Sequence, residues 1–192
     1  SNVRGLVFNP NGTRMFVTGG SSVSVHQYNL STVFDLSSAL FSGNSFDVSS
    51  EVVNSWGLAF NSTGTRMFVT DPNTDIIYQY NLGTGFDLST ASFSNNSLDV
   101  NSQVAIASSI TFNDTGERMF ILDRSSAALY QYNLTTGFDI TTASFSSISF
   151  DLSSEMNSPL HSTFDNNGVR LFVVGENNNA YQYNLTAPYD LT

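Results

Sequence analysis

Hydrophobic and polar residues alternate along short stretches of this chain, and turn-forming residues separate the stretches. One set comprises GLAF (57–60), TRMFVT (65–70) and IIYQYNL (76–82), followed by the weaker candidate ASFSNNSLDV (91–100). Period-two alternation rich in β-branched and aromatic residues is typical of half-buried β-strands. The intervening NSTG (61–64) has the composition of a turn. Since no segment keeps a helical period over three turns, the sequence predicts an all-β protein.

The same set of stretches recurs every 52 residues. The recurring positions are a Phe before the turn, a Gly within it and an Arg after it: Phe8, Phe60, Phe112, Phe164; Gly12, Gly64, Gly116, Gly168; Arg14, Arg66, Arg118, Arg170. HQYNL (26–30) and three copies of YQYNL follow, the last copy one residue early. The sequence therefore predicts one domain, 1–192, built from repeats 1–52, 53–104, 105–156 and 157–192.

Three or four strands in about 50 residues is the size of a β-propeller blade. A blade cannot bury both of its faces alone, so blades pack on one another. We therefore predict a β-propeller of four blade-like repeats with three to four antiparallel strands each. A β-solenoid or a sandwich is the competing architecture, but solenoid coils run about 20–30 residues.

The fourth-strand segments 39–48, 91–100 and 143–152 have no counterpart in the last repeat. The prediction is thus a last blade with three strands and an open sheet edge, which invites pairing with another chain. Three arrangements remain: a section of a longer array, self-association through open blade edges into a ring or fibre, or a closed four-bladed ring.

MFVTG (15–19) and MFVTD (67–71) each follow a turn and precede an aromatic strand. In this the chain resembles the YVTN/NHL-type propeller repeats, and the wider pattern is similar to tandem repeats of bacterial and archaeal surface proteins and phage structural proteins. The resemblance covers the whole chain and implies a propeller fold. It implies little about function. Phe16, Phe68, Phe120 and Phe172 stand where the family motif often has Tyr.

The composition is acidic and poor in charge. The net charge is −10, charged residues make up 11%, and all six basic residues are Arg. Such a chain repels phosphate, which argues against nucleic-acid partners and anionic membranes. No apolar run reaches the roughly 18 residues of a membrane-spanning helix, so membrane insertion is not expected. The Ser-, Thr- and Asn-rich composition without Lys favours an extracellular or cell-surface location.

The sequence contains no recognisable catalytic motif. Its two histidines, His26 and His161, occupy different places in their repeats, and neither lies in a motif with a nucleophile. Cys and Lys are absent, which removes thiol and amine nucleophiles. We therefore predict a protein that is not an enzyme, with no catalytic, cofactor or metal residues assigned.

Two series of aspartates recur with the repeat. They are Asp35, Asp87, Asp139 and Asp190, and Asp47, Asp99 and Asp151. A ring of carboxylates for cations is one interpretation. The favoured one is that each carboxylate accepts a backbone N–H in a local turn. DPNTD (71–75) has oxygen ligands at alternating positions but lacks the Gly and Glu of a calcium loop, so a hairpin turn is expected.

The arginines of the repeat could clamp carboxylates of neighbouring blades or bind an acidic sugar, and pairing with the Asp series is favoured. The paired tyrosines are expected to pack between blades with bonded hydroxyls rather than stack on sugars. These pairs are Tyr78 and Tyr80, Tyr130 and Tyr132, and Tyr181 and Tyr183.

Seven N-x-S/T sequons are candidates for N-glycosylation: Asn11, Asn29, Asn61, Asn95, Asn113, Asn133 and Asn184. Seven is hardly more than the composition alone would give. Their places in turns and at strand ends are exposed positions that suit a glycan.

The leading hypothesis is a non-catalytic extracellular structural or adhesive module, a glycosylated building block of a surface or fibrous assembly. Its expected partners are further copies of itself, with glycans as a second candidate. The alternative is a carbohydrate-binding propeller, and a second alternative is a propeller hydrolase or lactonase.

Overall fold

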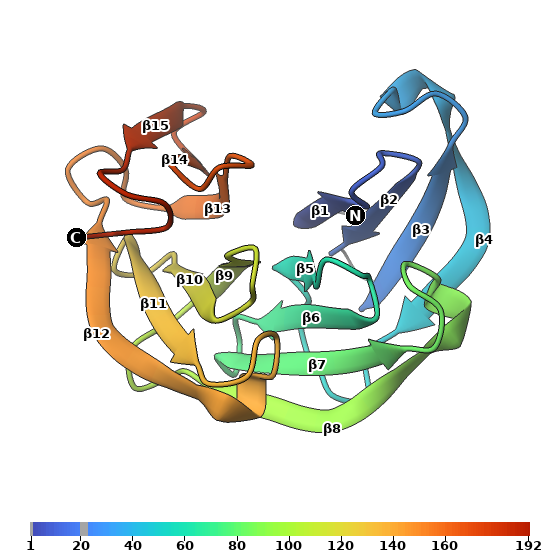
Figure 1. The fold of residues 1–192 in the computed structure, drawn as a ribbon, viewed down its shortest axis with the longest axis horizontal. Coiled ribbons are helices and arrows are strands. Elements are labelled where there is room, and N and C mark those ends of the chain that lie inside the picture. Colours follow the sequence, from blue (N-terminus) through green and yellow to red (C-terminus); the bar gives the residue numbers. More distant parts are fainter. Residues whose placement is uncertain (1, 20–22) are drawn as a thin grey trace.

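The computed structural model describes residues 2–19 and 23–192 as four antiparallel sheets arranged around a common centre (Figure 1). We call these sheets blades 1 to 4. Blade 1 holds β1 (Gly5–Phe8), β2 (Arg14–Thr18), β3 (Ser24–Leu30) and β4 (Ala39–Asp47). Blade 2 holds β5 (Leu58–Phe60), β6 (Arg66–Asp71), β7 (Ile76–Leu82) and β8 (Ala91–Asp99). Blade 3 holds β9 (Ala107–Phe112), β10 (Arg118–Asp123), β11 (Ala128–Leu134) and β12 (Ala143–Asp151). Blade 4 holds β13 (Pro159–Phe164), β14 (Arg170–Gly175) and β15 (Ala180–Asn184).

Within each blade the strands pair in chain order, with the first strand innermost and the last outermost (Figure 1). Three short 3-10 helices lead into the outer strands: η1 (Leu36–Ser38), η2 (Leu88–Thr90) and η3 (Ile140–Thr142). The weak strand candidate at 91–100 is the outer strand β8. The predicted β-propeller arrangement is confirmed, including a last blade of three strands.

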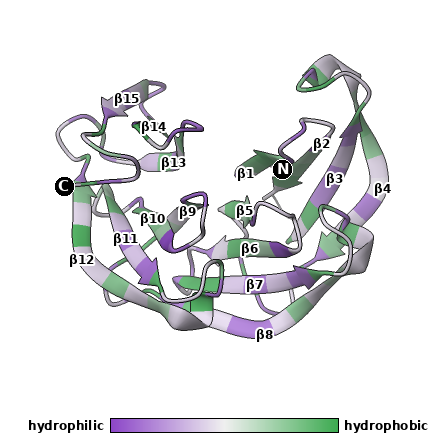
Figure 2. Cartoon of the chain, viewed as in Figure 1, coloured by the Kyte–Doolittle hydropathy of each residue, from purple (hydrophilic) through white to green (hydrophobic). Residues whose placement is uncertain are grey.

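The second strand of each middle blade, β6 or β10, is buried on both faces. In β6, Met67, Phe68, Val69 and Thr70 are all fully buried. Alternation along such a strand assigns residues to one neighbouring blade or the other rather than to core or solvent. The outer strands keep the half-exposed pattern, and Figure 2 shows hydrophobic and hydrophilic residues alternating along β12.

Three hydrophobic clusters lie between successive blades, and each contains a pair of phenylalanine rings. Each pair joins the second strand of one blade to the first strand of the next, with ring centroids 4.7 to 4.8 Å apart. The pairs are Phe16–Phe60, Phe68–Phe112 and Phe120–Phe164. Burial of one such ring is worth about 1.5–3 kcal/mol. Packing between blades is therefore the main source of stability.

The turn glycine of each repeat is required by both conformation and space. Gly116 has φ of 71°, in the left-handed region that favours glycine. The ring of Phe138 lies where its Cβ would be. Gly12, Gly64 and Gly168 hold Phe34, Phe86 and Tyr189 in the same way. The turn thus fixes the aromatic residue that begins the connection to the outer strand.

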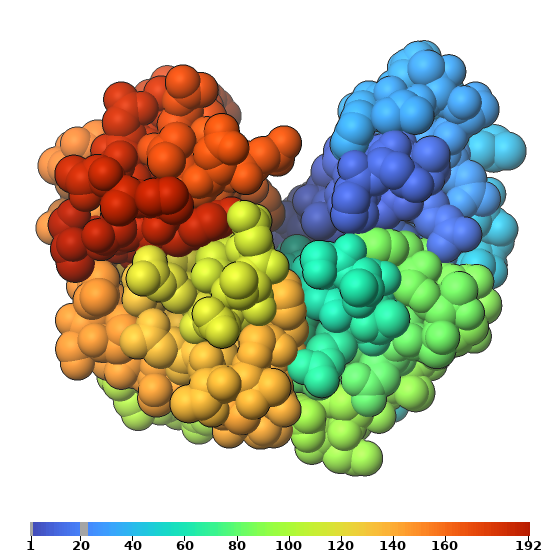
Figure 3. Space-filling view, viewed as in Figure 1, coloured from blue at the N-terminus to red at the C-terminus, as the bar shows by residue number. Residues whose placement is uncertain are grey.

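Blades 1 and 4 each leave one face without a neighbouring blade. A notch separates them in the space-filling view, between the blue and the red ends of the chain (Figure 3). Among the described residues, β15 of blade 4 pairs with β14 alone, so its outer edge is open. The open edge that the sequence predicts is therefore present.

Candidate functional site

The repeated arginines join neighbouring blades, but through backbone carbonyls. Arg14 Nη1 donates to the Phe86 carbonyl oxygen at 2.6 Å, and Arg66 Nη1 donates to that of Phe138 at 2.8 Å. Arg118 Nη1 donates to the Tyr189 oxygen at 2.9 Å. The predicted pairing with the Asp series is therefore wrong as a direct contact, and the Arg14 charge acts on Asp87 only as a lesser contribution, after the Ser89 hydrogen bond, to the lowered pKa of that carboxyl. The guanidinium instead holds the residue before each aspartate, because that carbonyl faces the preceding blade.

A second polar contact accompanies the arginine. Gln27 Oε1 accepts from the Leu88 N–H at 3.1 Å, and Gln79 Oε1 accepts from the Ile140 N–H at 3.4 Å. The side chains of Leu88 and Ile140 are buried against the preceding blade. The 3-10 helices η2 and η3 are thus each held by hydrogen bonds and by an inserted aliphatic side chain.

Tyrosines of the third strand pack between blades, as predicted. Tyr80 is fully buried, and its hydroxyl donates to Glu51 Oε2 at 3.2 Å. Tyr132 is buried and donates to Gln103 Oε1 at 3.1 Å. Burial raises the pKa of both phenols. Neither buried ring is placed to stack on a sugar.

Both aspartate series act in local turns, which confirms the favoured interpretation. Asp35, Asp87 and Asp139 each accept from the backbone N–H two residues on, at 2.9 to 3.1 Å. The Ser37 hydroxyl and then its backbone N–H lower the pKa of Asp35. The later series makes the same contact, as in Asp47 to the Ser49 N–H at 2.9 Å. These carboxylates cap the 3-10 helices or begin the next connection.

The DPNTD segment is the turn between β6 and β7, as predicted. Asp71 accepts from the Val53 N–H at 2.8 Å and from the Asn73 N–H at 3.0 Å. Asp75 accepts from the Ala107 N–H of blade 3 at 3.1 Å. Over the described residues, no group of three or more His, Asp or Glu side chains is placed to hold a metal ion.

The first strands surround a central channel containing a pocket of about 280 Å³. Its wall mixes apolar and polar side chains, the apolar ones including Leu6, Leu58 and Ile110 from blades 1 to 3. Blade 4 places Ser162 at the corresponding position, and its neighbour His161 also lines the pocket. The channel is where the four repeats differ most in their chemistry.

His161 and Ser109 are equivalent positions of adjacent blades and touch one another. Ser109 Oγ lies 3.2 Å from His161 Nδ1 and accepts from the Ser162 N–H at 3.4 Å. The hydroxyl oxygen has two lone pairs, so which of the two groups donates to the other is set by the tautomer of His161. Burial lowers the pKa of His161 below the ordinary value of 6.5. Ser109 is fully buried, which gives this pair a packing role between blades 3 and 4.

The lowered pKa of His161 predicts a loss of stability on the acid side. The unfolded chain binds a proton near pH 6.5 while the folded chain resists it, so stability is full above 6.5 and falls as the pH drops below it. His161→Gln should flatten this decline between pH 7 and pH 5. Urea unfolding at each pH measures it. An unchanged pH slope in the variant would contradict the assignment.

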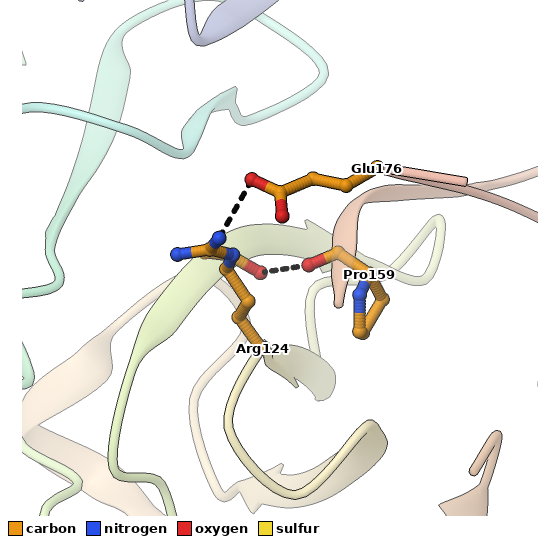
Figure 4. Close-up of polar contacts among 4 residues, drawn as sticks. Arg124, Pro159 and Glu176 are labelled. Carbon is orange, nitrogen blue, oxygen red and sulfur yellow. Dashed lines mark hydrogen bonds and ion pairs between the residues drawn. The ribbon is translucent and has the colours of Figure 1, made fainter. Parts of the chain in front are cut away.

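At one mouth of the channel, side chains from all four blades form a chain of contacts. The guanidinium carbons of Arg4 and Arg124 lie 4.5 and 5.6 Å from the centre of the Trp56 ring. Arg124 Nη2 lies 2.6 Å from Glu176 Oε1, and Figure 4 shows the two side chains meeting near Pro159. Cation–π contacts at such sites contribute about 0.5–1 kcal/mol. The cluster links the ends of the blades.

The sequence contains a signal for this region that repeat matching overlooks. Positions 4, 56, 108 and 160 are equivalent by the 52-residue step, yet carry Arg, Trp, Ser and Leu. Positions 5, 57, 109 and 161 carry Gly, Gly, Ser and His. The matching positions, such as the repeated Phe and Arg, lie mainly at the interfaces between blades. Of these non-matching positions, His161 lines the channel pocket, and Arg4 and Trp56 belong to the cluster that joins the blades.

The sequons fall into two groups. Five asparagines are exposed: Asn11, Asn29, Asn95, Asn133 and Asn184. Asn61 and Asn113 are half-buried, and their Nδ2 atoms, where a glycan would attach, donate to turn threonines at 3.1 Å. Asn95 lies in the irregularity of β8, with φ of 63°. The fold thus gives the seven sequons unequal access.

No helix in the described part of the chain combines the length and the apolar character needed to cross a bilayer.

Solved structures share this fold at low sequence identity. The chain resembles one in a nidogen/laminin complex, with TM-score 0.63, 16% identity and coverage of 98% of this chain and 62% of that chain. A putative 6-phosphogluconolactonase from Bacteroides uniformis gives a TM-score of 0.62 and 12% identity, with coverage of 95% of this chain and 50% of that chain. A protein from Lactobacillus plantarum gives a TM-score of 0.63 and 17% identity, with coverage of 96% of this chain and 51% of that chain. The chain thus spans half to about three fifths of the length of these chains. At such identities the likeness concerns the fold alone.

No protein-family model matches the chain, and a search of curated proteins finds no match.

Proposed function

We propose that this chain is a non-catalytic structural or adhesive module of an extracellular or cell-surface assembly, with propeller repeats of the YVTN/NHL type. The observation that carries the proposal is the use of the repeated polar side chains. Arg14, Arg66 and Arg118 join blades, and the aspartates cap local turns. A chain whose recurring polar groups hold its own units together suits a building block. Its low charge and hydroxyl-rich composition agree with this role.

Electron microscopy of the native material is the direct test. Particles that line a surface or form a fibre, and that are labelled by an antibody against this chain, would support the proposal. Dispersed single particles with no connection to a larger assembly would refute it.

Glycosylation is predicted at the exposed sequons. We expect glycan on Asn11, Asn29, Asn95, Asn133 and Asn184, because their side chains face solvent. Asn61 and Asn113 should stay unmodified, because their amide nitrogens are engaged in the turn. Intact mass before and after enzymatic deglycosylation, followed by peptide mapping, measures both. An unchanged mass, or modification confined to the half-buried pair, would contradict this prediction.

A carbohydrate-binding role is the second candidate, and the channel pocket favours it. Phe60 and Phe112 lie near Asn113 and Asp114 in its lining. Aromatic faces beside amide and carboxylate groups suit a sugar ring, which has apolar faces and polar edges. Binding to a glycan array that is lost in an Asn113→Ala variant would support this role. A module acting only as a scaffold should bind none of the glycans.

A further inference from the structure

Three kinds of contact recur at the interfaces between blades. An arginine donates to the carbonyl of an aromatic residue at all three interfaces, and two phenylalanine rings meet at all three. A glutamine accepts from the N–H that begins a 3-10 helix at the first two. The arginine and glutamine side chains come from one blade, and the backbone groups that they bind come from the next blade along the chain. Each interface therefore has a direction.

Blade 4 carries the donor set without a blade to receive it. Arg170 and Gln182 are the counterparts of Arg118 and Gln131, and both are exposed. Among the described residues, the Arg170 guanidinium has no hydrogen-bond partner, and the Gln182 side chain hydrogen-bonds only to Asn184. Phe172 likewise has no partner ring in the described part of the chain. We call Arg170, Phe172 and Gln182 the donor face.

Blade 1 carries the matching acceptor set. Leu36 is 59% exposed, whereas its counterparts Leu88 and Ile140 are 1% and 0% exposed. Phe34, whose counterparts Phe86 and Phe138 receive an arginine, is 56% exposed. No described arginine reaches the Phe34 carbonyl. We call Phe8, Phe34 and Leu36 the acceptor face.

We infer that the donor face of one copy binds the acceptor face of a second copy, head to tail. Arg170 then donates to the Phe34 carbonyl of the second copy, and Leu36 of the second copy enters the site that Leu88 or Ile140 fills at the internal interfaces. Phe172 meets Phe8 as the other ring pairs do. The inference rests on the proposed building-block function, and it identifies a second copy of the chain as the partner. Blades 1 and 4, which carry the two faces, border the notch in Figure 3.

A head-to-tail contact leaves one donor face and one acceptor face free on every assembly that does not close. Addition can therefore continue, and larger species are expected as the concentration rises. Each copy has a net charge of −10, so like-charge repulsion opposes association. Salt screens that repulsion, while the apolar and carbonyl contacts persist. Association should therefore strengthen with added salt.

Two face variants test the inference in solution. Arg170→Asp removes the donor face, and Leu36→Asp removes the acceptor face. Both positions are exposed, so both variants should fold with the circular dichroism and thermal midpoint of the parent. Val53→Asn is the matched control. Val53 is an apolar side chain that is 62% exposed, and the last repeat carries Asn157 at the corresponding position.

Analytical ultracentrifugation gives the readout against the 20.9 kDa monomer. The parent and the Val53→Asn control should associate with increasing concentration and salt, and each face variant alone should remain monomeric. An equimolar mixture of the two variants should form a complex of twice the monomer mass and stop there, since each partner keeps one intact face. This capped complex is the result that a nonspecific apolar patch would not give.

A parent that stays monomeric at all concentrations and salts would overturn the inference. So would face variants that associate like the parent, or a mixture that stays monomeric. Such outcomes leave the building-block function open, because microscopy of the native material tests that function separately. A chain that lies in a surface layer but does not self-associate would sink only the inferred contact.

Discussion

Replacing Phe68 by alanine should lower the free energy of unfolding by about 3–5 kcal/mol. The ring is fully buried on β6 and packs on Phe112 of blade 3, with centroids 4.7 Å apart. It belongs to the cluster between blades 2 and 3, so the cavity would open at an interface rather than inside one sheet. For a chain of this size the loss corresponds to about 6–20 °C in thermal midpoint.

Phe41→Ala is the matched control for this experiment. Phe41 lies on the outer strand β4 and is 48% exposed, so its truncation should cost about 1 kcal/mol or less. Urea titrations of both variants against the parent give the comparison. Equal losses for the two variants would show that the interface between blades is not where the stability lies.

The strands and their packing were predictable because each depends on local pattern. Alternation in 65–70 and 76–82 follows the two-residue period of a strand, and the 52-residue step shows that the strands form equivalent sheets. The roles of Asp87 and Tyr80 were also predictable from local sequence. A carboxylate two residues from an N–H forms a turn, and a tyrosine at strand spacing packs with its hydroxyl bonded.

The partner of the repeated arginines could not be predicted in this way. Arg14 donates to the carbonyl of Phe86, 72 residues away, and a carbonyl has no signature in the sequence. Charge complementarity therefore favoured the neighbouring Asp87, which is next in sequence but accepts from its own turn. Phe86 has φ of 58°, an uncommon conformation for a non-glycine residue that pattern reading does not foresee.

The channel was missed for a related reason. Trp56, Ser109 and His161 occupy positions where the repeats differ, so an alignment that rewards agreement gives them no weight. The contact between Ser109 and His161 depends on the packing of blade 4 against blade 3, which brings their first strands together. In a protein of near-identical units, the positions that break the repeat are the ones to inspect for a differentiated site.

Replacing Gly116 by alanine should lower the free energy of unfolding by about 2–5 kcal/mol. Gly116 has φ of 71°, and the left-handed conformation costs an alanine about 1–2 kcal/mol. The added Cβ would also overlap the Phe138 ring, and relief of such crowding costs about 1–3 kcal/mol. The ring cannot withdraw freely, because the Phe138 N–H donates to the Gly116 carbonyl at 3.0 Å and Arg66 holds the Phe138 carbonyl. A change in the turn of blade 3 should therefore also loosen its contact with blade 2.

Gly83→Ala separates this effect from the general consequence of adding a methyl group. Gly83 is exposed, lacks the positive φ, and its added Cβ would meet Thr90 at an ordinary 3.6 Å. The free energy of unfolding of this variant should differ from that of the parent by less than about 1 kcal/mol. A small increase is compatible with this, because alanine restricts the unfolded chain more than glycine does. Hydrogen exchange should rise along η3 in Gly116→Ala and stay unchanged there in Gly83→Ala. Similar losses in the two variants would mean that the turn and the blade contact are not coupled as the Phe138 geometry requires.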